Sequence, residues 1–227
     1  MPNKSKKRVL LTGATGFVGA NLARRLLSEG YAVHILTRKT SNRWRLKGIL
    51  AGLQDHIVDL REVARLNKVV GSIKPDIICH LATAAIYGGV HLPEKDLIDI
   101  NLLGTFNLIN ACEKINYSCF INTGTSSEYG PKPGRMRETD ICQPINVYGI
   151  TKLATALYAQ LVAKFSQKPI IHLRLFSPYG PYDDKSRLMT YAIVQALQGK
   201  ELRLADIHAV RDYIYIDDVI DLYLSGI

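Results

Sequence analysis

The sequence predicts an α/β protein: a Rossmann-type, doubly wound parallel sheet followed by a small, incomplete C-terminal substrate lobe. Short runs of β-branched and aliphatic residues alternate with segments of helical periodicity along most of the chain. Such alternation indicates βαβ units, whose strands run parallel. The first run also leads directly into a glycine-rich turn and a helical segment, T-G-A-T-G-F-V-G at 12–19, which is typical of this kind of sheet.

Six strands and four helices are expected, in order, before residue 176. Each expected strand is a short apolar run bounded by turn residues, and each expected helix repeats apolar residues every three or four positions. Gly30 follows the first helix as a C-terminal glycine does, and Pro75 precedes the fourth strand. The strands are expected at Val9–Thr12, Ala32–Thr37, His56–Val58, Asp76–His80, Cys119–Thr123 and Ile170–Leu175. The helices are expected at Phe17–Glu29, Arg61–Ser72, Leu97–Asn116 and Val147–Ser166.

The alternation of strands and helices ends at about Phe176. A turn-rich stretch, S-P-Y-G-P-Y-D-D, begins at Ser177. Beyond this stretch we expect a helix near Leu188–Gln198, a short strand at Leu202–Leu204 and a second helix from about Asp217. The last helical pattern continues to Ile227 with only a weak capping signal before it. We therefore expect the second lobe to be incomplete.

Composition limits the classes of protein that the chain can represent. Its 227 residues are 47% hydrophobic, enough for a sizeable core, and we expect a dinucleotide-binding domain with the catalytic residues over 1–175 and a partial substrate-binding lobe over 176–227. No apolar run approaches the roughly 20 residues of a membrane span, and the four cysteines lack metal-ligand spacing. We expect a cytoplasmic protein without a membrane partner or a metal site. The net charge of +9 is spread along the chain without a basic motif interleaved with aromatics, so we expect no nucleic-acid partner.

The glycine-rich turn has the spacing of a phosphate cradle. Gly13, Gly16 and Gly19 recur every three residues between the first strand and the first helix. Glycines allow the tight turn and let a pyrophosphate approach the backbone, while the helix N-terminus offers unpaired N–H groups and a partial positive charge. The turn therefore predicts a dinucleotide site, with contacts from Gly13, Thr15, Gly16, Phe17, Val18 and Gly19.

The end of the second strand bears on the choice between NAD and NADP. An NAD site usually has an acidic residue there, which binds the ribose 2′-hydroxyl. Thr37 and Arg38 stand in that place, with Arg43 nearby, so we expect NADP in preference to NAD; the alternative is that Arg38 stacks on the adenine or points to solvent. Asp59 is placed to accept a hydrogen bond from the adenine amino group, or else to cap the helix that begins near Arg61.

Tyr148 and Lys152 are separated by one helical turn in Y-G-I-T-K, so their side chains rise from the same face. A tyrosine with a pKa near 10 is a poor acid–base group at neutral pH. A neighbouring ammonium and the positive charge of an oxidised nicotinamide would favour the phenolate and lower that pKa. The pair is therefore expected to carry acid–base chemistry, with Lys152 also holding the ribose hydroxyls.

Further motifs occur in a consistent order along nearly the whole chain. They are V-D-L-R at 58–61, H-L-A-T at 80–83, N-L-L-G-T-F-N-L at 101–108, E-Y-G at 128–130, R-L-F-S-P-Y-G-P at 174–181 and R-D-Y-I-Y-I-D-D-V at 211–219. Together with the cradle and the tyrosine–lysine pair, they make the chain resemble the extended short-chain dehydrogenase/reductase superfamily, in its NAD(P)-dependent NDP-sugar epimerase/dehydratase branch.

The resemblance implies roles for particular residues. Tyr148 is implied as the acid–base residue, Lys152 as its partner, and Thr125 as the hydroxyl that contacts the reacting oxygen. Arg211 is similar to the arginine that clamps the sugar-nucleotide diphosphate. Besides the cradle residues, the implied cofactor contacts are Thr37, Arg38, Asp59, Leu60, Leu81, Ala82, Thr83, Tyr148 and Lys152. The implied substrate contacts are Thr125, Ser126, Ser127, Ser177, Arg187 and Arg211.

Two departures from the family pattern affect the expected reaction. Dehydratases of this branch follow the catalytic threonine with Asp-Glu, the pair that eliminates water, whereas Ser126-Ser127 stand here. Dehydration is therefore disfavoured, but Glu128, one step later, keeps it open as an alternative source of the acid or base. Ser177 replaces a usual asparagine, which weakens any expectation about the substrate.

The resemblance implies an enzyme that transfers a hydride at C4 of a nucleoside-diphosphate hexose. We expect a 4-epimerase first, then an NADPH-dependent 4-keto-6-deoxyhexose reductase, and a 4,6-dehydratase third because of Ser126-Ser127. A dinucleotide-binding module without turnover is the non-enzymatic alternative. The resemblance also implies a homodimer through the helices at 97–116 and 147–166.

Overall fold

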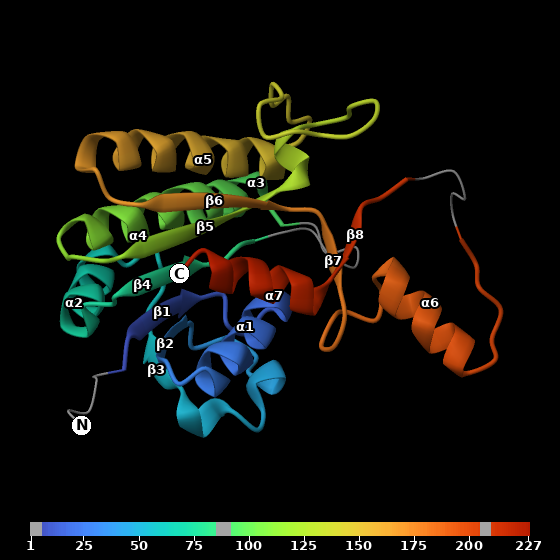
Figure 1. The fold of residues 1–227 in the computed structure, drawn as a ribbon, viewed down its shortest axis with the longest axis horizontal. Coiled ribbons are helices and arrows are strands. Elements are labelled where there is room, and N and C mark those ends of the chain that lie inside the picture. The colour runs from blue at the N-terminus through green and yellow to red at the C-terminus, as the bar shows by residue number, and fades with distance from the viewer. Residues whose placement is uncertain (1–5, 85–91, 205–209) are drawn as a thin grey trace.

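The computed structural model describes residues 6–84, 92–204 and 210–227. Its centre is a six-stranded sheet in which all paired strands run parallel, in the order β3-β2-β1-β4-β5-β6 (Figure 1). The Rossmann-type α/β fold is therefore confirmed. The strands are β1 Arg8–Thr12, β2 Ala32–Thr37, β3 Gln54–Ile57, β4 Ile77–His80, β5 Cys119–Thr125 and β6 Ile170–Leu175.

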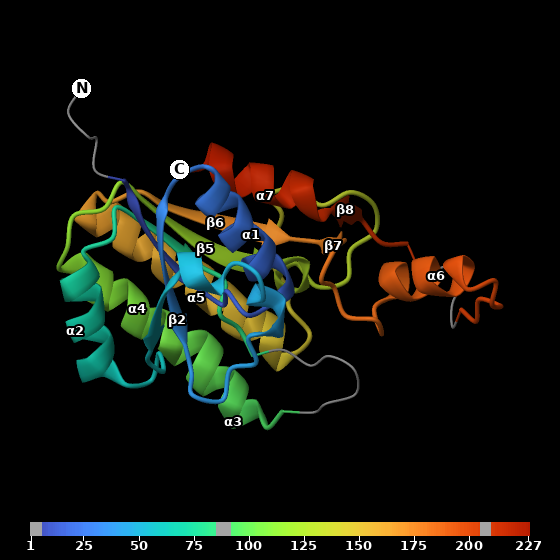
Figure 2. The ribbon, with the colours of Figure 1, turned by 90° about the horizontal axis from the view of Figure 1, so that it is seen from below.

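Helices cover both faces of the sheet, which explains why its central strands are apolar on both sides. Val9 and Leu11 of β1 pack with α1, Phe17–Ser28, and α7, Ile216–Ser225. Leu10 belongs to the opposite core, whose helices are α2 Val63–Ile73, α4 Gly104–Glu113 and α5 Val147–Ser166. The two layers are visible on either side of the sheet in Figures 1 and 2. The sheet is therefore a rigid frame whose strand ends can carry a site.

The strand order reverses between β1 and β4, and this places the candidate site. Chain segments leaving the carboxyl ends of these two strands diverge to opposite faces of the sheet, which opens a crevice at that edge. Thr12 and His80 are the last paired residues there. The Leu81 N–H donates to the Thr12 carbonyl oxygen over 3.2 Å, which ties the two departing segments together at the edge of the crevice.

The helix expected at 97–116 is present, but its first half is not regular α-helix. It consists of α3, Glu94–Leu97, a π-helical segment η3, Ile98–Leu103, and α4. The wider turns of η3 turn Asn101 inward, where its side chain is fully buried. π-Helical turns are rare and are often found at functional sites.

The strand expected at Leu202–Leu204 is wrong, because those residues form no strand and both leucines are exposed. An apolar run becomes a strand only where it finds a partner edge. The small second sheet instead pairs β7, Ser177–Tyr179, in parallel with β8, Tyr213–Tyr215. The helix expected at Leu188–Gln198 is α6, Leu188–Leu197, which projects away from the main sheet (Figures 1 and 2).

The final helix α7 returns to the main core. Ile216, Val219, Ile220 and Tyr223 are buried on the α1 side of the sheet. The division of the chain at residue 175 stays a prediction, although part of the segment beyond it packs with the first domain. Within the described residues, every helix is too short or too polar to cross a membrane.

Candidate active site

A cavity of about 490 Å³ opens at the carboxyl ends of β1, β4 and β5. It runs from the turn after β1 to the first turns of α5. Seventeen of the residues expected in a cofactor or substrate site line this one cavity: Gly13, Thr15, Gly16, Phe17, Val18, Gly19, Thr37, Arg38, Asp59, Leu60, Leu81, Ala82, Thr83, Thr125, Tyr148, Lys152 and Arg187. The fold therefore brings together residues as far apart in sequence as Gly13 and Arg187.

The glycine cradle is sterically required. Gly13 has a φ of +73°, and a Cβ there would lie 2.5 Å from the main-chain carbon of Leu81. A Cβ on Gly19 would lie 2.8 Å from the carbonyl carbon of Gly13. Gly16 is the N-cap of helix α1 and offers no side-chain cap, so the positive end of the helix dipole is open to the cavity. Close backbone approach and an uncapped helix end fit a dinucleotide pyrophosphate.

A buried histidine holds the far wall of the cradle. The Thr105 hydroxyl donates to the Asn101 carbonyl oxygen, so its oxygen accepts from His80 Nε2–H over 2.8 Å. His80 Nδ1 is then an acceptor for the Thr12 hydroxyl at 2.7 Å, and Thr12 Oγ1 accepts from the Ala82 N–H. Burial, and next the charge of Lys152, lower the pKa of His80 to about 3. The neutral ring therefore fixes the main chain at Ala82.

Asn101 holds the neighbouring stretch of the same wall. Its Oδ1 accepts from the Ala84 N–H at 2.7 Å and from the Thr83 hydroxyl at 3.1 Å, while its Nδ2 donates to the Ala84 carbonyl oxygen at 2.8 Å. The motif at 101–108 contains this asparagine, but sequence gave it no role. The same helix also contains Asn107 and Asn110, so its sequence does not single out Asn101, and the inward orientation of Asn101 depends on the π-helical turn.

The end of β2 differs from the sequence expectation. The guanidinium of Arg43 is occupied by protein groups. Its Nε forms an ion pair of 2.9 Å with Asp55, and its Nη2 donates to the Thr37 hydroxyl. Asp55, from β3, also accepts from that hydroxyl at 2.6 Å. A carboxylate from the neighbouring strand thus neutralises one of the two arginines on which the NADP expectation rested. Arg38 lines the cavity.

Asp59 lines the cavity and does not cap α2, which begins at Val63 with Glu62 as its N-cap and no side-chain cap. One of its oxygens accepts from the Arg61 N–H at 3.0 Å, and its other oxygen pairs with the Arg61 guanidinium at 2.8 Å. Hydrogen bonds from Arg61 outweigh the opposing effect of burial and lower the pKa of Asp59. Asp59 is therefore a fixed carboxylate at the rim, and an adenine contact stays a prediction.

Tyr148 and Lys152 line the cavity from the first turns of α5. Asn146 caps this helix by accepting from the Gly149 N–H at 2.8 Å, which fixes where the helix begins. Lys152 is only 2% exposed, and its Nζ donates to the Thr123 carbonyl oxygen at 2.8 Å. Burial lowers the pKa of Lys152 to about 8, against the opposing charge of Glu128. The ammonium is thus held at the end of β5, close to the last residue of that strand, Thr125.

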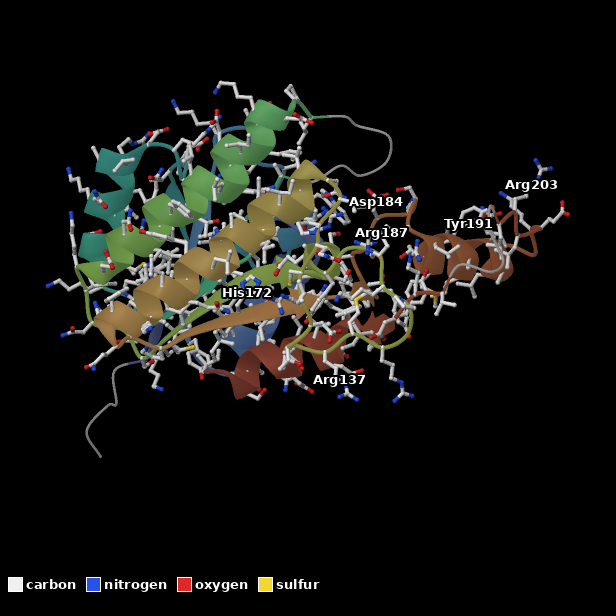
Figure 3. The ribbon with its side chains drawn as sticks, turned by 90° about the horizontal axis from the view of Figure 1, so that it is seen from above. Arg137, His172, Asp184, Arg187, Tyr191 and Arg203 are labelled. Carbon is white, nitrogen blue, oxygen red and sulfur yellow. The ribbon has the colours of Figure 1, made fainter. Side chains whose placement is uncertain are left out.

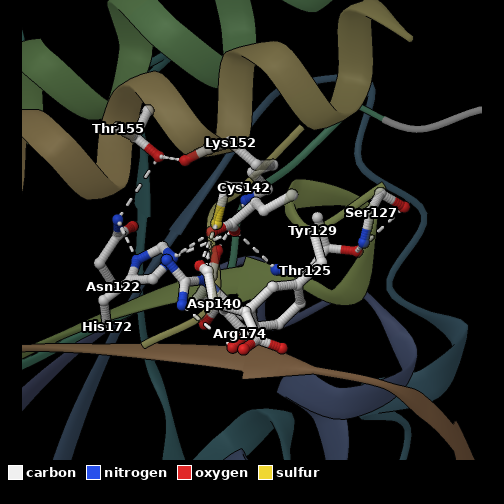
Figure 4. Close-up of polar contacts among 12 residues, drawn as sticks. Asn122, Thr125, Ser127, Tyr129, Asp140, Cys142, Lys152, Thr155, His172 and Arg174 are labelled. Carbon is white, nitrogen blue, oxygen red and sulfur yellow. Dashed lines mark hydrogen bonds and ion pairs between the residues drawn. The ribbon is translucent and has the colours of Figure 1, made fainter. Parts of the chain in front are cut away.

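Thr125 ends β5 and caps the short helical turn η4, Ser126–Glu128. Its Oγ1 accepts from the Ser127 N–H at 3.2 Å, and its own N–H donates to Glu128 Oε1 at 2.8 Å. Figure 4 shows Thr125 and Lys152 near the same strand end, below α5. Ser126 and Ser127 line neither of the two described hollows, so their expected substrate contacts stay predictions.

Glu128 does not face the cavity. Its side chain is fully buried and pairs with Arg174 and His172 of β6. The expectation that Glu128 could serve as the acid or base of a dehydratase therefore has no support in its position.

The other expected substrate residues line a second hollow of about 240 Å³. Ser177 and Arg211 lie in it, and Arg187 and Asp183 line both hollows. Figure 3 places Asp184 and Arg187 at the junction between the sheet and α6. A ligand could therefore extend from the main cavity toward Arg211, past Arg187.

Sequence reasoning missed a strap, residues 181–184, that borders the main cavity and is bonded to α1 and to Arg45. The Pro181 carbonyl oxygen accepts from Asn21 of α1 at 3.0 Å, and the Tyr182 carbonyl oxygen accepts from Arg45 Nε at 2.8 Å. The Arg24 guanidinium lies 4.0 Å from the centre of the Tyr182 ring. Among the cavity residues that had not been expected are Ser41, Arg45, Asp183 and Asp184, from the two sides of this strap. The contacts join segments more than a hundred residues apart, which no local pattern indicates.

Comparison with known proteins places this geometry in a family. The profile of the "NAD dependent epimerase/dehydratase family" matches residues 9–225. The chain belongs to that family. The epimerase/dehydratase family profile thus covers the cradle, the tyrosine–lysine pair and the final helix α7.

Several proteins are similar to this chain in both sequence and fold. UDP-glucose 4-epimerase of Mycoplasma genitalium is 27% identical, over 95% of this chain and 69% of its own length. The structure of Thermus thermophilus UDP-glucose 4-epimerase with NAD is 27% identical, with a TM-score of 0.81 over 96% of this chain and 73% of that chain. That of UDP-glucuronic acid 4-epimerase from Bacillus cereus, with UDP-glucuronic acid and NAD, is 29% identical, with a TM-score of 0.82 over 96% and 72%.

These comparisons bear on the expected cofactor. Both solved relatives named above bind NAD, and nothing in them supports the expected preference for NADP. The chain spans about 70% of the length of each relative. Within the described ranges, no group of three or more His, Cys, Asp or Glu side chains is arranged to hold a metal ion.

Proposed function

We propose that this chain acts on a nucleoside-diphosphate hexose as a 4-epimerase that uses a nicotinamide dinucleotide. The observation that carries the proposal is the single cavity that joins the glycine cradle to Thr125, Tyr148 and Lys152. A dinucleotide seated on the cradle would extend toward the end of β5, where the three side chains lie. Relatives at 27–29% identity that carry the 4-epimerase name support the same reaction.

The proposed chemistry divides the work between the cofactor and three side chains. A bound nicotinamide would accept a hydride from C4 of the sugar and return it to the opposite face, which inverts that carbon. Tyr148 would remove the proton of the C4 hydroxyl and later return it, and Thr125 would hold the same oxygen by a hydrogen bond. The buried charge of Lys152 favours the phenolate form of Tyr148.

The competing reactions differ in what they need from the loop after β5. A 4,6-dehydratase needs an acid and a base beside Thr125, but Ser126-Ser127 follow it and Glu128 is sequestered by Arg174 and His172. A 4-ketoreductase needs only the residues of the epimerase, together with a cofactor that leaves after each turnover. The strap at 181–184 is bonded to Asn21 and Arg45 at the border of the cavity, which favours a cofactor that is retained between turnovers and therefore the epimerase.

We infer that NAD is the cofactor, in place of the NADP expected from Thr37-Arg38. The ion pair between Arg43 and Asp55 supports this inference, because it withholds one guanidinium from a 2′-phosphate. Arg38 alone would meet the ribose of the adenosine half. Equilibrium binding of NAD and NADP, compared between the wild type and Asp55→Asn, tests this step: releasing Arg43 should improve NADP binding relative to NAD.

The substrate is proposed to be a UDP-sugar with its diphosphate between Arg187 and Arg211. Both arginines border the hollow next to the main cavity, and guanidinium groups bind diphosphates through paired hydrogen bonds. The Bacillus cereus relative, 29% identical, is solved with UDP-glucuronic acid. A cytoplasmic location also stays part of the proposal.

A homodimer through α4 and α5 is proposed as well. Helix α5 carries large apolar side chains that stay exposed, as does Leu103 just before α4, and the rings of Phe106 and Tyr158 stack 3.9 Å apart between the two helices. Exposed apolar clusters of this kind mark interfaces between proteins. The exposed set is Leu103 just before α4, and Ile150, Leu157, Leu161 and Phe165 along α5.

The experiment that tests the proposed function incubates the protein with NAD and UDP-glucose or UDP-glucuronate and separates the products. Formation of the 4-epimer is expected in the wild type, and its loss in Tyr148→Phe with NAD binding retained. Net oxidation of reduced cofactor in step with product, seen only with a 4-keto sugar, would favour the reductase. Tight NAD binding with no product from any sugar nucleotide would favour the binding module.

A further inference from the structure

Glu128 is the most deeply buried carboxylate next to the candidate site, and the proposed chemistry leaves it without a task. Its side chain has 0% exposure. One oxygen accepts from the Thr125 N–H at 2.8 Å, and the other from Arg174 Nε at 2.7 Å and His172 Nε2 at 3.0 Å. A buried charge of this kind is costly unless several partners satisfy it. Its partners converge from β5 and β6.

The strand itself makes room for this carboxylate. Gly124 lies next to Thr125 in β5, and a Cβ there would lie 2.7 Å from Cε1 of His172 and closer still to Nε2 and to Glu128 Oε1. The carboxylate and the imidazole therefore press directly against the strand backbone. Any larger residue at 124 would push them away from the Thr125 N–H. Glycine at this position thus serves the contact between Glu128 and the strand end.

The partners of Glu128 are themselves held by further hydrogen bonds. Asn122 Nδ2 donates to His172 Nδ1 at 3.0 Å, which leaves Nε2–H of the ring to point at Glu128. Arg174 is itself held by the Tyr129 hydroxyl at 3.1 Å. Figure 4 shows Asn122, His172, Arg174 and Thr125 grouped between α5 and β6. The carboxylate is therefore held in place from β5, η4 and β6 together.

We propose that Glu128 is a positioning residue of the active site, which fixes the main chain of Thr125 from behind and supplies a fixed negative charge to Lys152. The inference rests on the proposed function for its effect on turnover. Glu128 touches neither cofactor nor substrate in this account. It acts through Thr125, whose N–H it binds, and through Lys152, whose ammonium is held by the carbonyl oxygen of Thr123 in the same strand.

The electrostatic part of the proposal has a definite sign. Burial alone would raise the pKa of Glu128, but hydrogen bonds from His172, Arg174 and the Thr125 N–H hold it below its ordinary value. The carboxylate is therefore charged at neutral pH. Its charge counters the burial that lowers the pKa of Lys152. The other titratable groups that face Lys152 are His80 of β4, which stays neutral, and Tyr148 one turn earlier in α5.

The test combines one isosteric variant with two matched controls. Glu128→Gln keeps an oxygen for the Thr125 N–H but removes the charge. Because this leaves Arg174 buried without its partner, a second variant, Glu128→Gln/Arg174→Gln, removes both charges and guards against misfolding. Tyr129→Phe loses one hydrogen bond to Arg174 and leaves the bond between Glu128 and Thr125 intact. Thermal melting and circular dichroism confirm that each variant is folded.

The first measurement needs no turnover: an NMR titration of 13Cε-labelled lysine in the cofactor-free protein, with Lys152 assigned through Lys152→Met. The midpoint of Lys152 is expected at about 8 in the wild type and in Tyr129→Phe, because neither lacks the charge of Glu128. It is expected at lower pH in Glu128→Gln, and by a smaller amount in the double variant, because that variant also removes the positive charge of Arg174. An unchanged midpoint in folded Glu128→Gln variants would overturn the electrostatic part.

The second measurement uses epimerase turnover, if the wild type shows it. In Glu128→Gln, kcat should fall by about tenfold to a hundredfold with KM for the sugar nucleotide nearly unchanged, as expected for a misplaced catalytic group. The alkaline limit of kcat should move to lower pH, which a purely structural loss would not do. A folded variant with wild-type kcat and pH profile would overturn the positioning role. Absence of turnover in the wild type would refute the proposed function, while the lysine titration would still test this inference.

Discussion

Lys152 Nζ donates a hydrogen bond of 2.8 Å to the carbonyl oxygen of Thr123. This bond joins α5 to the end of β5, across the floor of the candidate site. Lys152 is almost completely buried, so the position of its charge is set by the fold and not by solvent. The first prediction follows from that burial.

Lys152 should make the stability of the protein rise with pH in the alkaline range. Its pKa is lowered from 10.5 to about 8 in the folded state. Between these values the unfolded chain binds more protons than the folded chain, so the free energy of unfolding should rise by about 3 kcal/mol as pH increases through the window. Urea unfolding of wild type and Lys152→Met at several pH values measures the difference. Identical pH dependence in the two proteins would contradict this prediction.

Turnover should respond to the same ionisation in the opposite sense. Below about pH 8, Lys152 carries the charge that favours the Tyr148 phenolate; above it, that charge is lost. The kcat of the wild type should therefore decline as pH rises beyond about 8. Lys152→Arg keeps a charge that does not titrate in this range, so any residual activity in that variant should lack the decline. A kcat that stays level in the wild type well above pH 8 would exclude this role.

Tyr223 should stabilise the fold through its bond to the catalytic strand. Its hydroxyl lies 2.6 Å from the Thr123 hydroxyl, and the side chain is completely buried. Tyr223→Phe removes the bond, at a cost of about 1 kcal/mol in the free energy of unfolding. Tyr191→Phe is the control, because the Tyr191 hydroxyl has only a long contact of 3.4 Å at an exposed site. Equal stabilities of the two variants would show that the contact to Thr123 contributes nothing.

The strap should slow the exchange of the cofactor. Arg45→Ala removes the hydrogen bond to the Tyr182 carbonyl oxygen, one of the two hydrogen bonds that hold the strap at the border of the cavity. We expect bound NAD to dissociate several times faster in this variant, as measured by stopped-flow fluorescence of the reduced form. Arg203→Ala, at an exposed site outside both hollows, is the matched control. If dissociation is equally fast in wild type, Arg45→Ala and Arg203→Ala, the strap does not retain the cofactor.

The proposed dimer should depend on the exposed face of α5. A charge at the centre of a dimer interface is strongly unfavourable, so Leu161→Glu should shift the protein toward monomers in sedimentation velocity. Val63→Glu places the same charge on an exposed apolar position of α2 and should leave the oligomeric state unchanged. A wild-type protein that is monomeric at high concentration would rule out this interface.

Sequence alone predicted the features that depend on local geometry. The cradle was predictable because Gly13 must adopt a positive φ and Gly19 must approach Gly13 closely, and only glycine allows both. The pairing of Tyr148 with Lys152 followed from helical spacing. The parallel, doubly wound sheet followed from the alternation of strands and helices.

Features that depend on contacts between distant segments were not predictable. Glu128 was assigned to possible acid–base chemistry because its buried partners, His172 and Arg174, lie more than 40 positions later. The pairing of β7 with β8 was hidden because β7 contains a proline and its partner lies beyond α6. Asp55 was overlooked because the acidic residue was sought on β2 and not on the neighbouring strand.

The central claim is that Tyr148, Lys152 and Thr125 support removal and return of one hydride at C4 within a closed site. The most direct test supplies a UDP-hexose with deuterium at C4, together with unlabelled NAD in excess. The account predicts a 4-epimer that retains the deuterium at C4, with no label in the free cofactor and no reaction in Tyr148→Phe. A product that has exchanged the deuterium with the added cofactor or with solvent, or no 4-epimer from any UDP-hexose, would contradict it.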